Sequence, residues 1–196
     1  MSAIRNLPKS IRIKRNSYKL RTDFRTWIDV ERILMDDNIP PNFKIYVMSN
    51  NLDLFFGNEQ IFDEPMDAIM SGILSFWSLF KNDDKSTETK KTNTDIAYDY
   101  DEDYDLICAA FMQQYGINLR RARLHWFEYK SLFDGLTRET QFVKIVGYRT
   151  TDINKLPKEQ RKEARHLKEL YAIRKNQPPK RTQKEIEAEL LAKLKE

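Results

Sequence analysis

The sequence predicts a mainly α-helical fold, with an N-terminal β-hairpin followed by a helical bundle and amphipathic C-terminal helices. Only 5 of the 196 residues are glycine and 33% are charged, a composition that favours helices over a sheet with many turns. Apolar residues recur at spacings of three and four along most of the chain, as a helix with one buried face requires. The single cysteine excludes an intrachain disulfide and indicates a reduced, intracellular compartment.

The hairpin is predicted in the stretch SIRIKRNSYKLRTDF. Ile11 and Ile13 alternate with basic residues, the pattern pauses at Asn16-Ser17, and Tyr18 and Leu20 resume it. This alternation is typical of two short strands with one buried face.

Two helices are predicted between the hairpin and residue 80. Thr22 or Asp23 caps the first, whose apolar spacing continues to Asp36, ahead of Pro40-Pro41. The second is predicted in DEPMDAIMSGILSFWSLF, with acidic residues and Pro65 in its first turn. The stretch between them, FKIYVMSNNLDLFF, fits either a strand or a helix. The inward positions of the second helix are Met66, Ile69, Met70, Ile73, Leu74, Trp77 and Phe80.

The chain divides around a polar segment. Residues 81–95 contain no large apolar side chain and cannot offset the entropy of ordering, so we expect a flexible linker there. It separates the hairpin and helices of residues 1–80 from a helical core in residues 96–150. Residues 151–196 are expected to form a charged, amphipathic helical tail.

Five acidic side chains lie within residues 99–105, directly before an apolar-rich run. Acidic residues in a first turn stabilise a helix through its macrodipole, by roughly 0.3 to 1 kcal/mol each when exposed. An EF-hand loop starting at Asp99 would need Gly at its sixth position and Glu at its twelfth, where Tyr104 and Ala110 stand. We therefore interpret the cluster as the start of a helix that ends at Gly116, and predict no metal or catalytic role for it.

Four further helices are predicted after residue 119. They lie in RRARLHWFEYKSLFDGL, in TRETQFVKIVGYR with Thr137 as its cap, in PKEQRKEARHLKELYAIRK and in TQKEIEAELLAKLKE. Thr182 and Glu185 have capping-box spacing at the start of the last helix, which is marginal alone and is expected to dock on a partner or a second copy. The expected inward positions of the first two are Leu124, Phe127, Leu132, Leu136, Phe142, Ile145, Val146 and Arg149.

The sequence predicts no enzyme, no cofactor and no metal site. Its two histidines are His125 and His166, and a thiolate–base pair of Cys108 with His125 is disfavoured because Cys108 lies on an apolar stripe. The chain has no glycine-rich phosphate loop, no nucleophile elbow and no zinc-spaced Cys or His pairs. It also has no apolar run long enough to span a membrane.

Charge is arranged in blocks along the chain. The net charge is +6 over residues 1–35, −11 over residues 36–105 and +9 over residues 106–196. Such blocks favour complementary partners, including other copies of the chain. They also leave open a nucleic-acid-binding alternative, which the acidic middle disfavours. Its phosphate-contacting arm would be Arg5, Lys9, Arg12, Lys14 and Arg15.

Aromatic side chains are concentrated on one predicted helix. Trp126, Phe127 and Tyr129 face three sides of it, more than one buried stripe takes up, so we expect an additional contact surface. The residues expected to contact a partner are Phe111, Tyr115, Trp126, Tyr129, Leu190 and Leu194.

Three blocks within residues 7–150 resemble a known family: YKLRTDFRTW, YDYDEDYDLICAAFMQQYGINL and LHWFEYKSLFDGLTRETQFVKIVGYR. They look like a small helical protein of tailed bacteriophages of Gram-positive hosts, encoded next to the tape measure gene. The resemblance implies a tail assembly chaperone, a non-catalytic homo-oligomer that coats the tape measure protein and helps recruit tail tube protein. Such a protein acts in the host bacterial cytoplasm and is absent from the mature virion. A head-tail connector that stays in the virion is a further alternative.

Overall fold

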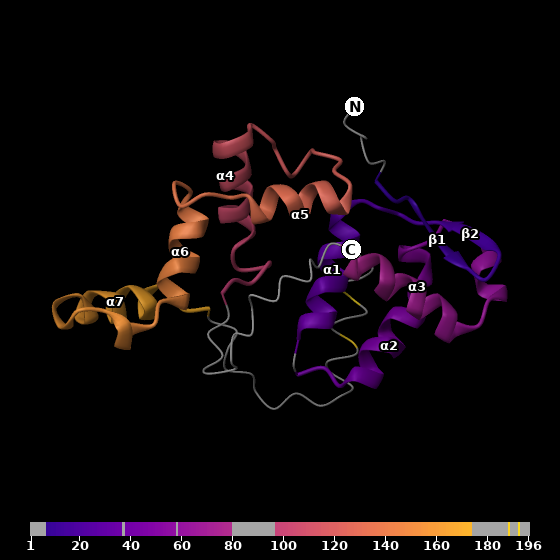
Figure 1. Cartoon of the computed structure of the whole chain (residues 1–196), viewed down its shortest axis with the longest axis horizontal. Helices are drawn as coiled ribbons and strands as arrows, with labels where there is room; N and C mark the ends of the chain where they lie inside the picture. The colour runs from indigo at the N-terminus through magenta and orange to yellow at the C-terminus, as the bar shows by residue number, and fades with distance from the viewer. Residues whose placement is uncertain are drawn as a thin grey trace. The chain divides into compact units, whose positions relative to one another are not determined.

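The computed structural model describes residues 7–36, 38–57, 59–79 and 97–173, with residues 188 and 192 (Figure 1). The predicted fold class is confirmed: within these ranges an N-terminal two-stranded hairpin precedes seven α-helices. Three short 3-10 helices connect them. The elements are β1 (Ser10–Ile13), β2 (Asn16–Lys19), α1 (Phe24–Met35), α2 (Pro41–Ser49), η1 (Leu52–Leu54), η2 (Glu59–Asp63), α3 (Met66–Ser78), α4 (Tyr104–Tyr115), α5 (Trp126–Asp134), α6 (Gln141–Thr150), η3 (Ile153–Lys155) and α7 (Lys158–Leu170).

The described residues form two compact units. Unit 1 contains the residues up to 79 together with residues 123–130, and unit 2 contains residues 97–122 and 131–173. The residues of α5 are therefore shared between the two units. The predicted linker, residues 81–95, lies outside the described residues.

The hairpin of unit 1 is antiparallel, and Ile11 pairs with Tyr18 and Ile13 with Asn16. Its turn lies at Lys14-Arg15, two residues before the predicted pause at Asn16-Ser17. Lys14 takes a positive φ of 52°, as the favoured two-residue hairpin turns require. Glycine is the usual residue at such a position, and the sequence has none there. Asn16 instead begins β2.

Helix α1 begins as predicted, since the carboxylate of Asp23 accepts a hydrogen bond from the Arg25 backbone N–H. The stretch that fitted either a strand or a helix contains most of α2, which Pro41 starts at its first position. In α3 the fourth buried residue is Phe76 rather than the predicted Trp77. The ring of Phe76 packs at a tilt against Trp27 of α1, with ring centroids 4.4 Å apart, and this pair lies in the core of unit 1.

Residues 123–130 complete the core of unit 1, although they are far from its other residues in sequence. The backbone N–H of Trp126 donates to the Thr22 carbonyl at 2.8 Å, and that of Phe24 donates to the Leu124 carbonyl at 3.1 Å. The ring of Tyr129 stacks on Phe24 at 4.8 Å. These contacts make the first part of α5 a buried element.

Unit 2 is built on α4 and α6, which pack against each other. Gly116 ends α4 at φ 67°, the left-handed conformation predicted for it. The cap of α6 is Thr140 and not the predicted Thr137: its hydroxyl accepts from the Val143 backbone N–H, while it donates to the Thr137 carbonyl. Helix α5 starts at Trp126, six residues later than RRARLHW suggests.

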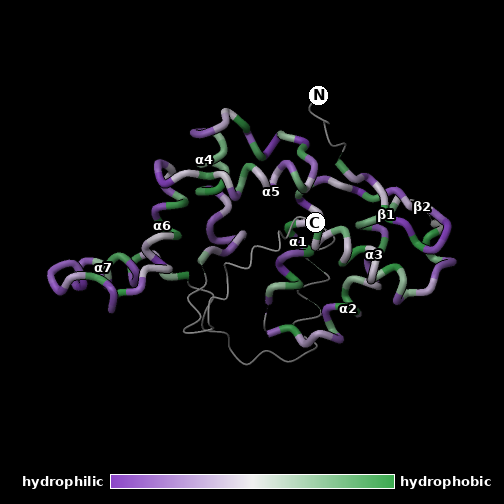
Figure 2. Tube along the Cα trace, in the orientation of Figure 1, coloured by the Kyte–Doolittle hydropathy of each residue, from purple (hydrophilic) through white to green (hydrophobic). Residues whose placement is uncertain are grey.

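The sequence predicts that helix α7 of unit 2 begins at Pro157. The helix begins one residue later, with Pro157 as its N-cap, and it buries none of its residues. Figure 2 colours much of this helix purple, for hydrophilic residues, with short green stretches. The helix predicted after Thr182 lies outside the continuously described ranges.

Candidate functional site

Three of the predicted partner-binding side chains lie in the core. Phe111 has no exposed surface, and Trp126 and Tyr129 are each 1% exposed. Tyr115 is half-buried, and its hydroxyl donates to the Leu132 carbonyl at 2.8 Å. We therefore assign no partner contact to Phe111, Trp126 or Tyr129 in the folded chain. The last two predicted residues, Leu190 and Leu194, lie outside the described residues.

The aromatic side chains that point to three sides of α5 are all buried by packing. Trp126 and Tyr129 stack on each other with centroids 5.9 Å apart, and Tyr129 also stacks on Phe24. Phe127 stacks on Phe76 at 4.9 Å. The expectation of an extra contact surface here is wrong, because α1 and α3, distant in sequence, cover two sides of the same helix.

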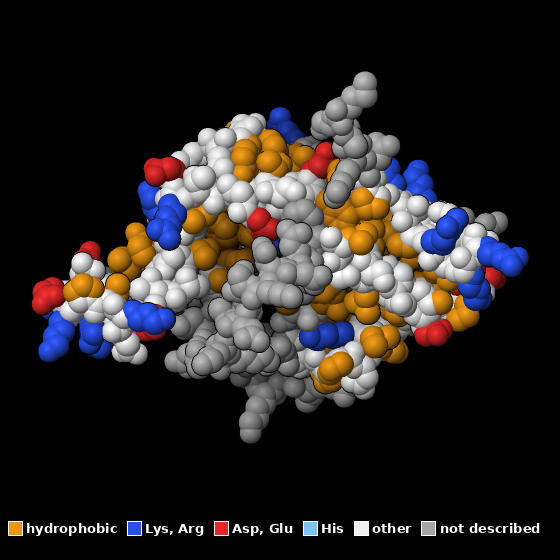
Figure 3. Space-filling model, in the orientation of Figure 1, with side chains coloured by type: hydrophobic (Ala, Val, Ile, Leu, Met, Phe, Trp, Pro, Cys, Tyr) orange, Lys and Arg blue, Asp and Glu red, His pale blue; other side chains and the backbone are white. Residues whose placement is uncertain are grey.

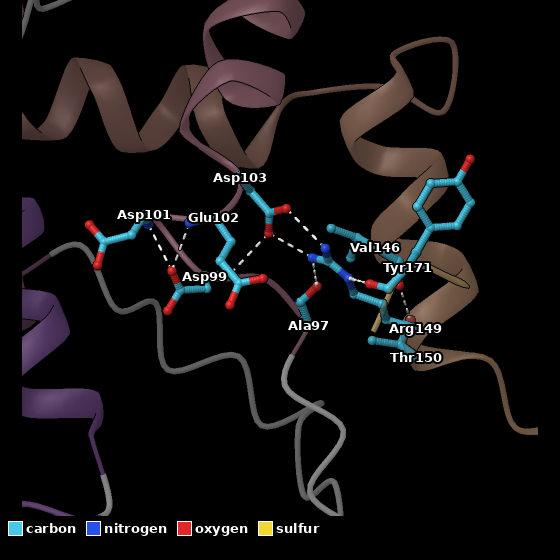
Figure 4. A network of polar contacts seen from close by, with 9 residues as sticks. All are labelled: Ala97, Asp99, Asp101, Glu102, Asp103, Val146, Arg149, Thr150 and Tyr171. Carbon is cyan, nitrogen blue, oxygen red and sulfur yellow. Dashed lines mark hydrogen bonds and ion pairs between the residues drawn. The ribbon is translucent and has the colours of Figure 1, made fainter. Parts of the chain in front are cut away.

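The acidic cluster is used to start α4 (Figure 4). The Asp99 carboxylate accepts from the backbone N–H groups of Asp101 and Glu102, at 2.8 and 2.9 Å. Asp103 precedes the helix, is 1% exposed, and accepts from the Asp99 N–H at 3.0 Å. No group of three or more His, Cys, Asp or Glu side chains that could hold a metal ion occurs among the described residues.

Arg149 of α6 is the buried partner of Asp103. Its Nη1 and Nη2 donate to the two carboxylate oxygens at 2.6 and 2.9 Å, and its Nε donates to the Tyr171 carbonyl at 2.6 Å (Figure 4). Nη1 also donates to the Ala97 carbonyl at 3.3 Å. This network joins four segments of unit 2 and occupies four of the five N–H donors of the guanidinium. The sequence placed Arg149 on an inward stripe, a signal of a buried charge, but not its partner.

His125 is held by backbone groups. Its Nδ1 accepts from the Phe127 N–H at 3.1 Å, and its Nε2 lies 2.8 Å from the Pro8 carbonyl, so the proton is assigned to Nε2. Both ring nitrogens are engaged, and His125 belongs to unit 1 whereas Cys108 belongs to unit 2. The prediction that the chain is not an enzyme stays a prediction.

Large apolar side chains are exposed on both units, as the orange groups in Figure 3 show for one face. Single exposed apolar residues are common on any protein surface. Ile45 and Tyr46 differ because they are consecutive residues of α2 and each is 48% exposed. The exposed large hydrophobic residues are Met35, Ile45, Tyr46, Phe62, Met66, Leu79, Tyr104, Met112 and Leu170. We call Ile45 and Tyr46 the α2 apolar pair.

An open groove of about 420 Å³ runs between β1 and α3 in unit 1. We call it the edge groove. This volume lies in the roughly 300–1,000 Å³ range of ligand pockets. Every residue from 10 to 14 lines it and no residue of β2 does, so it follows the outer edge of β1. The α3 side is formed by Ala68, Ser71, Gly72, Ser75, Phe76 and Leu79.

The hairpin tip beside this groove is fixed by Glu64. Its carboxylate accepts from the Tyr18 hydroxyl at 2.7 Å and from Asn16 at 3.0 Å, and pairs with Lys14 at 3.0 Å. These hydrogen bonds, that from Tyr18 first, lower the pKa of Glu64, and the same bond raises the pKa of Tyr18. Of the predicted basic arm, Lys9, Arg12 and Arg15 are exposed, while Arg5 lies outside the described residues.

Comparison with known proteins gives one family. A family model described as Bacteriophage Gp15 protein matches residues 4–173. No curated protein and no solved structure matches the chain. None of the described helices combines the length and apolar content needed to cross a membrane.

Proposed function

The chain belongs to the bacteriophage Gp15 protein family, and from this premise we propose that it is a tail assembly chaperone. In this role it self-associates, binds and solubilises the phage tape measure protein, and helps recruit tail tube protein. It acts in the host cytoplasm without catalysis or cofactor and leaves before the virion is complete.

The exposed apolar side chains carry this proposal. A long tape measure helix presents apolar stripes before the tube encloses it, and an amphipathic client of this kind binds through helix-in-groove contacts. The α2 apolar pair offers two large, adjacent side chains for such a contact, next to the buried Phe43 and Val47 that fix the helix in unit 1. We place the client contact on these residues in place of the buried aromatic residues of α5.

Self-association is supported by α7. This helix of 13 residues buries none of them, and Leu170 is 61% exposed. An amphipathic helix of this length gains most of its stability from packing of its apolar face. A second copy that covers Leu167 and Leu170 would supply that packing, and many weak sites on one oligomer would hold a long client by avidity.

The proposal is tested by mixing the purified chain with a purified helical segment of the tape measure protein. Size-exclusion chromatography with light scattering should show the chain as an oligomer that co-elutes with the segment. A strictly monomeric chain that elutes apart from the segment at micromolar concentration would contradict the proposal.

Nucleic-acid binding is the second candidate, favoured by the exposed cations Lys9, Arg12 and Arg15 on and beside the hairpin. A gel shift titrated with salt distinguishes this candidate from the chaperone role, because the affinity of binding through several phosphates falls steeply as ionic strength rises. For the connector alternative, mass spectrometry of purified virions is decisive, since a chaperone should be absent from them.

A further inference from the structure

The outer edge of β1 carries unused backbone hydrogen-bonding groups. Leu20 N–H donates to the Lys9 carbonyl at 2.9 Å, which identifies Lys9 and Leu20 as a hydrogen-bonded pair. Hydrogen-bonded and non-hydrogen-bonded pairs alternate along an antiparallel ladder. With the observed register, Ile11 and Ile13 therefore bond to β2, whereas the N–H and C=O groups of Ser10 and Arg12 point outward. Among the described residues these outward groups have no backbone partner.

The outward backbone groups of Ser10 and Arg12 lie along the edge groove and are not covered by α3. Ile11 packs directly on Gly72 of α3, where a Cβ would come within 2.6 Å of the Ile11 Cδ1 atom. The helix is thereby held close to the inner face of the strand. Ser71 and Ser75, which line the groove, are exposed, so the side chains of an added strand have room beside the helix. An edge strand next to a helix is the arrangement in which extended peptides add to a sheet.

The charge of the groove selects its occupant. The residues that line it include two cations, Arg12 and Lys14, and no acid. Lys14 is already paired with Glu64, whereas Arg12 is exposed and has no ion pair with any described residue. Lys9, Arg15 and Lys19, exposed on the same hairpin and its flank, add to the positive field.

We propose that the edge groove binds an extended, acidic segment of a partner polypeptide, which adds to β1 as a third strand. The backbone of the segment pairs with Ser10 and Arg12, its small or branched side chains lie against Ser71 and Ser75, and its acidic flank meets Arg12. This site is separate from the α2 apolar pair, so it stands or falls independently of the chaperone proposal.

The test uses a fluorescein-labelled peptide of alternating valine and threonine with two aspartates at each end, titrated with the full chain by fluorescence anisotropy. Arg12→Thr removes the charge and keeps the backbone N–H, whereas Arg12→Pro removes both. Proline is tolerated at an edge position whose N–H points outward, so the pairing with β2 is retained. We expect Arg12→Pro to bind the peptide roughly tenfold more weakly than Arg12→Thr.

A second pair of variants probes the helix side of the groove. Ser75→Trp fills the groove and should abolish binding, while Met66→Trp places the same side chain at an exposed position on the opposite side of the same helix and should bind like the wild type. Circular dichroism confirms that each variant is folded, and Ser71→Trp, at another groove-lining position, replaces Ser75→Trp if that variant is not. The proposal is overturned if the wild type does not bind the peptide, if the two Arg12 variants bind equally, or if Ser75→Trp binds normally. Binding of an oligothymidine in place of the peptide would also overturn it.

Discussion

Arg149 and Asp103, 46 residues apart, form a bidentate ion pair with N–O distances of 2.6 and 2.9 Å, and both side chains are buried. The pair ties the residue before α4 to the last turn of α6. Because Arg149 also donates to the Tyr171 carbonyl, the segment after α7 is joined to the same point. The polar centre of unit 2 is thus structural.

Removing one member of this pair should destabilise unit 2 strongly. Arg149→Met leaves the Asp103 carboxylate buried without its counter-ion, and loss of one partner of a buried pair costs about 3–5 kcal/mol. Guanidinium denaturation followed by circular dichroism measures the change. Replacing both residues, as Asp103→Leu with Arg149→Met, should recover most of the loss. A single variant as stable as the wild type would show that the pair is not held as described.

Two glycines should respond to alanine in opposite directions. Gly116 has φ 67°, where a Cβ costs about 1–2 kcal/mol, so Gly116→Ala should lower the free energy of unfolding by that amount. Gly147 lies inside α6 with nothing within 4 Å of an added Cβ, so Gly147→Ala should raise it by about 0.5–1 kcal/mol. Denaturation curves of the two variants and the wild type measure these changes in the free energy of unfolding. Changes of the same sign in both variants would contradict the assigned end of α4.

Acid should loosen the hairpin of unit 1 through Glu64. Because the pKa of this carboxyl is lowered in the folded state, its contribution is present above its unfolded pKa, about 4.3, and is lost as pH falls through the folded value. Between those values the unfolded chain binds more protons, so the free energy of unfolding must fall as pH falls. Glu64→Gln should flatten this part of the pH profile. If the free energy of unfolding of Glu64→Gln depends on pH in the same way as that of the wild type, the prediction is wrong.

The α2 apolar pair should affect client binding far more than stability. Ile45→Glu with Tyr46→Glu places two charges on exposed positions, so the denaturation midpoint should fall only slightly, through loss of the Tyr46 ring that stacks on Phe43. Binding of the tape measure segment should weaken at least tenfold, because each lost apolar side chain removes part of the buried area. Asn42→Glu adds a charge at another exposed position of α2 and is the control, which should bind normally.

Local signals predicted much of this fold. Asp23 at a cap, Pro157 before α7 and Gly116 after α4 act through neighbouring backbone, so short stretches of sequence reveal them. The strand turn at Lys14 was missed because no glycine or asparagine marks its positive φ.

The candidate site was less predictable because it depends on long-range packing. The sequence does not show that Trp126 and Tyr129 are buried, because this depends on Tyr129 stacking on Phe24, about a hundred residues away, and on Trp126 stacking on Tyr129. The partner of Arg149 could have been any of the five acidic residues at 99–105, and only the fold selects Asp103. Predicting the edge groove would require knowing the pairing register of β1 and β2 and the close approach of Ile11 to Gly72. The sequence alone shows neither.

The solubility of the tape measure protein when it is co-expressed with this chain tests the central claim most directly. We predict that the wild-type chain moves the tape measure protein into the soluble fraction and co-purifies with it. The Ile45→Glu, Tyr46→Glu variant, expressed at the same level, should leave more of it in the pellet. A tape measure protein that stays insoluble beside abundant wild-type chain, with none retained on affinity purification, would contradict the chaperone role.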